Sequence, residues 1–84
     1  MTIRLRLFAT AREAAGRSSD EFELPDGAAL RDLVSAARTR YGERFTDVLA
    51  TAGVWVNGDE PVAGDATLLA AGDEVAVLPP VSGG

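Results

Sequence analysis

The chain has 84 residues, of which 46% are hydrophobic and 25% are charged, and its formal net charge at pH 7 is -5. It contains no Cys, His or Lys, so disulfides are excluded and the usual nucleophiles, general bases and soft metal ligands are largely missing. A chain this short predicts one small domain without a deep enzyme cleft, and its acidic balance argues against nucleic acid as a partner.

Residues 3 to 8 predict the first strand. Ile3, Leu5 and Leu7 alternate with polar residues, which is the period-two pattern of a strand with one buried face. Phe8 falls on the polar face of this strand, where either a local loop covers it or a partner binds it. The residues alone leave these two interpretations open.

A short helix and a second strand follow. The segment Thr10-Ala11-Arg12-Glu13 has capping-box spacing, which predicts a helix start with the Thr10 hydroxyl as its cap, and Gly16 predicts the helix end. Residues 20 to 24 alternate again, with Phe22 facing inward, and a Pro-Asp-Gly turn closes them. We therefore expect the first two strands to form an antiparallel hairpin.

The main helix is predicted over residues 28 to 41. Gly42 is expected to end it, whereas Ala28-Ala29 offers no side-chain cap at its start, at a cost of about 1 kcal/mol. The apolar residues between 45 and 49 predict a further short helical turn over one end of the sheet. The buried stripe of the main helix follows the i, i+3, i+4 spacing and comprises Leu30, Leu33, Val34, Ala37 and Tyr41.

The second half of the chain predicts three more strands. Valines flank Trp55 in the first of them, and Asn57-Gly58 favours a tight hairpin that returns along a short strand at Val62. Residues 74 to 78 alternate again and form the last strand. The order predicts one α+β domain over residues 1 to 78, a mixed sheet with one main helix packed on one face.

Residues 79 to 84 are left as a flexible C-terminal tail, which reads Pro-Pro-Val-Ser-Gly-Gly. The two prolines end sheet pairing and direct the tail away from the body, and six residues can extend about 20 Å. Gly83 and Gly84 lack side chains, so they can thread a channel too narrow for other residues. Carboxylates elsewhere lie in turns and read as solvated, so the Gly84 carboxylate is the best candidate for chemistry, with a frayed terminus as the simpler alternative.

With these features the chain resembles the ubiquitin-like sulfur carriers, and among them the family of molybdopterin synthase small subunits. The motifs that carry the resemblance are Phe8-Ala9-Thr10-Ala11-Arg12-Glu13, Val56-Asn57-Gly58 and the stretch from residue 72 to residue 84. The resemblance implies a ubiquitin-like β-grasp fold, in which the first and last strands are parallel and adjacent at the centre of the sheet.

The resemblance also implies the chemistry of the tail. The chain has no Gly-x-x-x-x-Gly-Lys loop for ATP, so a separate E1-like enzyme would use ATP and Mg to adenylate Gly84, and a persulfide donor would form the thiocarboxylate. Pro80, Val81, Ser82 and Gly83 would thread into the large subunit of the synthase, where two carriers in succession supply the dithiolene sulfurs of molybdopterin. The chain itself would have no active site, bind no cofactor or metal, and be a monomer alone and a heterotetramer with the large subunit.

The same resemblance assigns a partner interface. Phe8 and Leu78 would lie on neighbouring central strands, on the face away from the main helix, and form an apolar patch that docks on both partners. Arg12 matches a family position that can pair with an acid of the activating enzyme. This implication favours the partner-facing interpretation of Phe8.

Three other functions fit the sequence. The first is a sulfur carrier for another product, such as thiamine, cysteine or thiolated tRNA. The second is a ubiquitin-like modifier joined through Gly84 to lysines of its targets, and the third is a β-grasp binding module with an incidental tail. No apolar run reaches the roughly 18 residues that span a bilayer, so in each case we expect a soluble, cytoplasmic protein.

Overall fold

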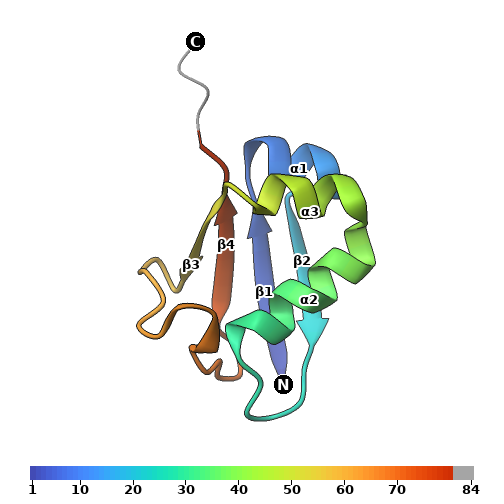
Figure 1. Cartoon of the computed structure of the whole chain (residues 1–84). Coiled ribbons are helices and arrows are strands. Elements are labelled where there is room, and N and C mark those ends of the chain that lie inside the picture. The colour runs from blue at the N-terminus through green and yellow to red at the C-terminus, as the bar shows by residue number, and fades with distance from the viewer. Residues whose placement is uncertain (81–84) are drawn as a thin grey trace.

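The computed structural model describes residues 1–80 and shows a four-stranded mixed sheet with helices packed on one of its faces (Figure 1). In chain order the elements are β1 (Thr2–Leu7), α1 (Ala9–Ala15), β2 (Ser19–Glu23), α2 (Leu30–Tyr41), α3 (Glu43–Leu49), β3 (Gly53–Val56), the 3-10 turn η1 (Gly64–Ala66) and β4 (Glu74–Leu78).

The strand order is β2-β1-β4-β3, with β1 and β4 parallel at the centre and the two outer pairs antiparallel. This arrangement confirms the α+β, β-grasp prediction and the β1–β2 hairpin. It also confirms the central parallel pair, which follows from the resemblance and which periodicity alone cannot give. In the part of the chain that the structure describes, no helix is long and apolar enough to cross a membrane.

The core lies between the sheet and the helices, as the alternation in the strands predicts. Leu5 on β1 and Val75 on β4 are directly paired and both are 1% exposed, while Leu33 of α2 covers them from the helix side at 1% exposed. Phe22 of β2 and Phe45 of α3 fill the ends of the same cluster. Each of these side chains contributes about 1.5–3 kcal/mol of hydrophobic stabilisation.

The first helix begins differently from the prediction. It starts at Ala9 with Phe8 as its N-cap residue, and no side chain within residues 1–80 caps its first turn, so the predicted Thr10 cap is wrong. The Phe8 carbonyl instead accepts hydrogen bonds from the amides of Ala11 and Arg12 at 3.0 and 3.3 Å. The predicted end is confirmed, because Gly16 has φ +77° and its amide closes the last turn.

The main helix begins at Leu30, after the uncapped Ala29, but half of its missing cap is supplied from inside the helix. The Asp32 carboxylate accepts a hydrogen bond from the Ala29 amide at 2.8 Å, as the acidic member of a capping box does. The acidic side chain also favours the positive end of the helix dipole. Both interactions offset part of the cost of about 1 kcal/mol expected for an alanine cap.

The predicted strand at Val62 is wrong, although the turn before it is confirmed. Asn57 and Gly58 both have positive φ, +52° and +84°, and the Val56 amide donates to the Asp59 carbonyl across the turn. Beyond this single bridge the chain leaves the sheet, and Val62 is 96% exposed. The preceding residue is a proline, which has no amide to donate to a sheet ladder.

Candidate functional site

The tail leaves the body from the centre of the sheet. β4 ends at Leu78 and pairs with β1 on one side and β3 on the other, so Pro79 and Pro80, which follow it, start from a fixed point at the end of the sheet (Figure 1). Pro79 is half-buried at this point and Pro80 is exposed. The predicted threading residues 81–83 and the predicted reactive residue, Gly84, lie outside the described residues.

Two apolar side chains lie side by side at the root of the tail. Leu7 of β1 pairs with Val77 of β4, and both are buried under the helices, so Phe8 and Leu78, one residue further on, face the other way. The Phe8 amide donates to the Val77 carbonyl at 3.3 Å. Phe8 and Leu78 are 38% and 39% exposed, which makes them a candidate docking patch rather than part of the core.

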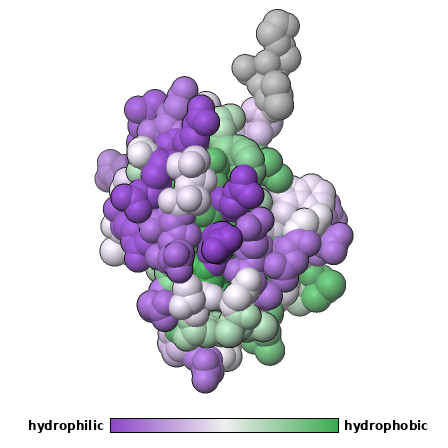
Figure 2. Space-filling view, turned by 180° about the vertical axis from the view of Figure 1, so that it is seen from behind, coloured by the Kyte–Doolittle hydropathy of each residue, from purple (hydrophilic) through white to green (hydrophobic). Residues whose placement is uncertain are grey.

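The patch interrupts a polar surface. Figure 2 shows the sheet from the face opposite the helices, where hydrophobic side chains gather below the tail and hydrophilic side chains cover most of the remainder. Arg6 borders the patch, with its guanidinium carbon 5.4 Å from the centre of the Phe8 ring and its Nη1 4.0 Å from Glu74 Oε1. The aliphatic stem and the cation of Arg6 thereby support the exposed ring.

The third predicted interface residue lies on another element at the same end of the molecule. Arg12 is exposed on α1, the helix that follows Phe8 directly (Figure 1). No carboxylate within residues 1–80 forms an ion pair with Arg12, so its charge is available to a partner. The structure thus places Phe8 and Leu78 at the root of the tail and Arg12 on α1, the helix that follows Phe8, while their role in docking stays a prediction.

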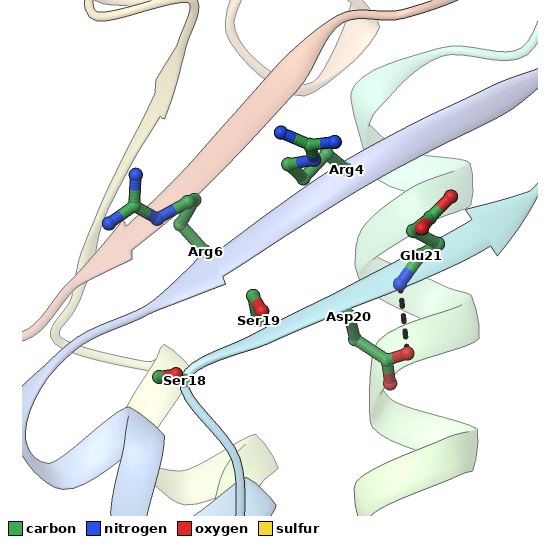
Figure 3. A pocket seen from close by; sticks show the side chains of 6 residues that line it. All are labelled: Arg4, Arg6, Ser18, Ser19, Asp20 and Glu21. Atoms are coloured by element: carbon green, nitrogen blue, oxygen red, sulfur yellow. Dashed lines mark hydrogen bonds between the residues drawn. The ribbon is translucent and has the colours of Figure 1, made fainter.

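A shallow hollow of about 550 Å³ lies elsewhere on the open sheet face (Figure 3). It is lined by Arg4, Arg6, Ser18, Ser19, Asp20 and Glu21. Arg4 and Glu21 pair directly across β1 and β2, which is the opposite-charge arrangement that stabilises neighbouring strands. Within residues 1–80 no group of three or more potential ligands could hold a metal ion. We interpret the side chains that line the hollow as charged and polar residues of the exposed sheet face that pair with one another across the strands.

Asp20, at the edge of the hollow, fastens β2 to the end of α2. Its carboxylate accepts hydrogen bonds from the Tyr41 hydroxyl at 2.6 Å and from the Glu21 amide at 2.8 Å (Figure 3, for the latter). Arg40 and Arg17 lie 3.0 and 3.2 Å from it. Burial alone would raise the pKa of Asp20, but these hydrogen bonds and the Arg40 charge outweigh it and lower the pKa to about 2.

Tyr41 responds in the opposite direction, because burial and its hydrogen bond to the Asp20 carboxylate raise the pKa of the phenol. Its ring also packs edge-on against Phe22 and Phe45. The Asp20 cluster therefore joins the sheet, α2 and α3, and its partners are all satisfied within the fold. It holds the scaffold and offers no reactive group.

Trp55, which no sequence motif marks as functional, lies on the same open face as the patch. In the β3–β4 ladder Trp55 faces Ala76 and Gly53 faces Leu78, so the half-buried indole belongs to the row of side chains beside Leu78. A tryptophan on the outward-facing position of a strand was the available signal, since its neighbours Val54 and Val56 take the inward positions.

A mixed sheet with a parallel central pair, one main helix across one face and two prolines after the central strand β4 define a ubiquitin-like β-grasp protein. Comparison of the sequence agrees with this class. The ThiS family profile matches residues 5–84, and the chain belongs to this family of ubiquitin-like sulfur carriers.

Individual relatives cover the whole chain. It is 37% identical over 84 residues to the molybdopterin synthase sulfur carrier subunit of Chlamydomonas reinhardtii, with all of both chains covered. It is 38% identical over 92 residues to small archaeal modifier protein 3 of Haloferax volcanii, again over all of both chains. Among solved structures, SAMP1 from Haloferax volcanii superposes with a TM-score of 0.88 at 28% identity, covering 100% of each chain.

Proposed function

We propose that this chain is the sulfur carrier subunit of a molybdopterin synthase. The observation that carries the proposal is the end-to-end 37% identity to the Chlamydomonas subunit of that enzyme. Two features of this chain support it: a tail that follows the central strand β4 at Leu78, with an apolar patch at its root, and an exposed Arg12 on α1 that forms no ion pair within residues 1–80. In this proposal the β-grasp domain docks on a partner enzyme, while the tail carries the reacting carboxylate of Gly84.

The chemistry takes place at the Gly84 carboxylate. A carboxylate oxygen attacks the α-phosphorus of ATP on an E1-like adenylating enzyme, with Mg bound by that enzyme, and pyrophosphate leaves. The terminal sulfur of a donor persulfide then attacks the acyl carbon and AMP leaves, which gives an acyl disulfide. A second thiol attacks the donor's own sulfur in that acyl disulfide, and the thiocarboxylate of Gly84 leaves. The donor and the second thiol are then joined as a disulfide. Adenylation is needed because a free carboxylate is a poor electrophile.

The large subunit of the synthase is the proposed acceptor. The tail would thread into it through Pro80, Val81, Ser82 and Gly83, and two carriers in succession would supply the two dithiolene sulfurs. Because the chain provides neither base nor cofactor for these steps, the catalytic groups belong to the large subunit. We expect a monomeric carrier that becomes part of a heterotetramer with two large subunits.

The test is the intact mass of the chain after incubation with the host's adenylating enzyme, ATP and a persulfide donor. The expected result is a gain equal to the replacement of one oxygen by sulfur, absent from a variant that lacks Gly84. No gain, with the enzyme shown active on another carrier, would refute the proposal. Binding of the thiocarboxylate form to the host's large subunit, followed by dithiolene formation, then identifies the pathway.

A second function is favoured by a specific relative, because the chain is equally similar to small archaeal modifier protein 3. A modifier would be joined through Gly84 to lysine amines of its targets. Denaturing gels of cell extract probed for this chain distinguish the two: a ladder of heavier species that disappears when Gly84 is deleted supports modification. A single band of free chain supports the carrier. A carrier that fails to bind the large subunit would point to a thiamine, cysteine or tRNA pathway.

A further inference from the structure

We infer that Trp55 on the edge strand β3, which lies against Gly53, is a further docking residue. The partner that binds it is the adenylating enzyme that activates the tail. The inference rests on the proposed function, because it assigns a surface to the partner that activates Gly84. It extends the predicted patch of Phe8 and Leu78 from the central strands to the edge of the sheet.

Gly53 and Trp55 together continue the apolar patch. Gly53 faces Leu78 in the ladder and is exposed, and it has no side chain to separate Leu78 from the indole. A Cβ atom placed on Gly53 would lie 3.2 Å from Trp55 Nε1 and 3.9 Å from Cδ1, so the indole lies against the glycine backbone. The apolar surface is therefore continuous from β1 across β4 to β3.

The polar atom of the indole, Nε1, has no hydrogen-bond partner among the residues that the structure describes. Within residues 1–80 no acceptor receives the Trp55 N–H, and no side-chain polar atom is both buried and unpaired, so the N–H is open to solvent. A half-buried indole with a free N–H is a typical binding hot spot, since it buries a large apolar area and donates one directional hydrogen bond.

The position of the indole argues for the adenylating enzyme as occupant. The Gly53 end of β3 lies beside the Leu78 end of β4, where the tail begins (Figure 1). From Pro79 to Gly84 the tail spans at most about 20 Å, so an enzyme that encloses Gly84 lies within that distance of the root of the tail, beside this face. The partner surface that fits is apolar, with a hydrogen-bond acceptor opposite the indole nitrogen. The other strongly exposed apolar side chains, Val62 and Leu68, lie on the loop between β3 and β4.

The first experiment uses the fact that Trp55 is the only tryptophan in the chain. Labelling with 5-fluorotryptophan gives one ¹⁹F resonance, which is followed while unlabelled adenylating enzyme from the host is added. The expected result is a shift of this resonance on binding and loss of its dependence on H2O or D2O as solvent, because the fluorinated ring becomes buried. A resonance that keeps its full solvent dependence in the saturated complex would overturn the inference.

The second experiment compares dissociation constants of three variants for the same enzyme. Trp55→Ala should weaken binding about tenfold, the effect of truncating an aromatic residue that acts as a binding hot spot. Gly53→Val should also weaken binding, because a Cβ atom at this position lies 3.2 Å from Trp55 Nε1 and the valine side chain displaces the indole. The Tm of the same variant, measured beside the dissociation constant, reports any change in the stability of the fold. Leu68→Ala, at a side chain that is 71% exposed and distant from the tail, is the matched control and should bind like the wild type.

The outcomes separate this inference from the proposed function. If wild-type chain is adenylated and Trp55→Ala binds within twofold of it, the docking role is wrong while the carrier function stands. If Trp55→Ala weakens binding only to the large subunit, the occupant assigned here is wrong. If wild-type chain is not adenylated at all, the proposed function itself fails.

Discussion

Replacing Asp20 by Asn should destabilise the fold at neutral pH and change nothing at low pH. The Asp20 carboxylate has a pKa of about 2 instead of 3.8, so it is bound more tightly as an anion in the folded chain than in the unfolded one. A difference of nearly two pKa units corresponds to roughly 2.4 kcal/mol at most. Because Arg17 and Arg40 are about half exposed and screened by solvent, we expect about 1–1.5 kcal/mol.

The sign of the pH dependence follows from the direction of the shift. A lowered pKa stabilises the folded state above pH 3.8, where the carboxyl is ionised even in the unfolded chain, and that stabilisation is lost as the pH falls towards 2. Urea unfolding followed by circular dichroism at several pH values between 2 and 7 measures it. The difference between wild type and Asp20→Asn should be constant above about pH 5 and nearly vanish at pH 2.

The comparison is sharpened by a matched variant. Asp65→Asn removes an exposed carboxylate that makes no hydrogen bond or ion pair with residues 1–80, and it should change the unfolding free energy by less than about 0.5 kcal/mol. General acid destabilisation affects all three proteins and cancels in the differences. A gap between wild type and Asp20→Asn that persists unchanged at pH 2 would refute the assignment of the stability to the ionised Asp20 cluster.

Three other substitutions separate the core, the docking patch and the tail. Leu33→Ala removes a side chain that is 1% exposed and should cost about 2–5 kcal/mol in urea unfolding, and a loss below 1 kcal/mol would contradict its place in the core. Phe8→Ala should weaken binding of the host's adenylating enzyme about tenfold, with Tm lowered by only a few degrees because the ring is 38% exposed; unchanged binding in titration calorimetry would count against the patch. Gly84→Ala should abolish thiocarboxylate formation in the mass assay while Tm stays that of the wild type, because β4 already ends at Leu78; a large drop in Tm would mean that the tail packs on the body.

The elements of the core were predictable because each one follows from a single local pattern. The alternation of Ile3, Leu5 and Leu7 and the stripe of α2 both appear in the structure as buried faces. The failures occur where a non-local contact or the backbone decides. The cap of α1 depends on the Phe8 carbonyl, which no side-chain motif reveals, and Val62 lacks a strand partner because the chain turns away after Asp59.

The candidate site was predictable in a different way. The tail motif identifies itself in the sequence, whereas the meeting of Phe8 and Leu78, 70 positions apart, depends on the parallel pairing of β1 with β4. Strand periodicity cannot select a pairing partner, so only the family resemblance supplied it. Trp55 was missed for a related reason: its importance depends on Gly53 facing Leu78, a register that exists only in the folded sheet.

The choice of basic residues bears on how such a carrier avoids reacting with itself. An adenylated or thiocarboxylated Gly84 is an acyl donor on a tail that reaches about 20 Å, far enough to contact much of its own surface. A lysine there would offer an amine nucleophile, but all eight basic residues are Arg, whose guanidinium stays protonated at physiological pH and is a poor nucleophile. No side chain of the chain can therefore capture its own activated carbonyl as an amide. The same absence prevents lysine-linked chains of this protein, so if it does modify other proteins, copies cannot be joined to one another through a lysine side chain.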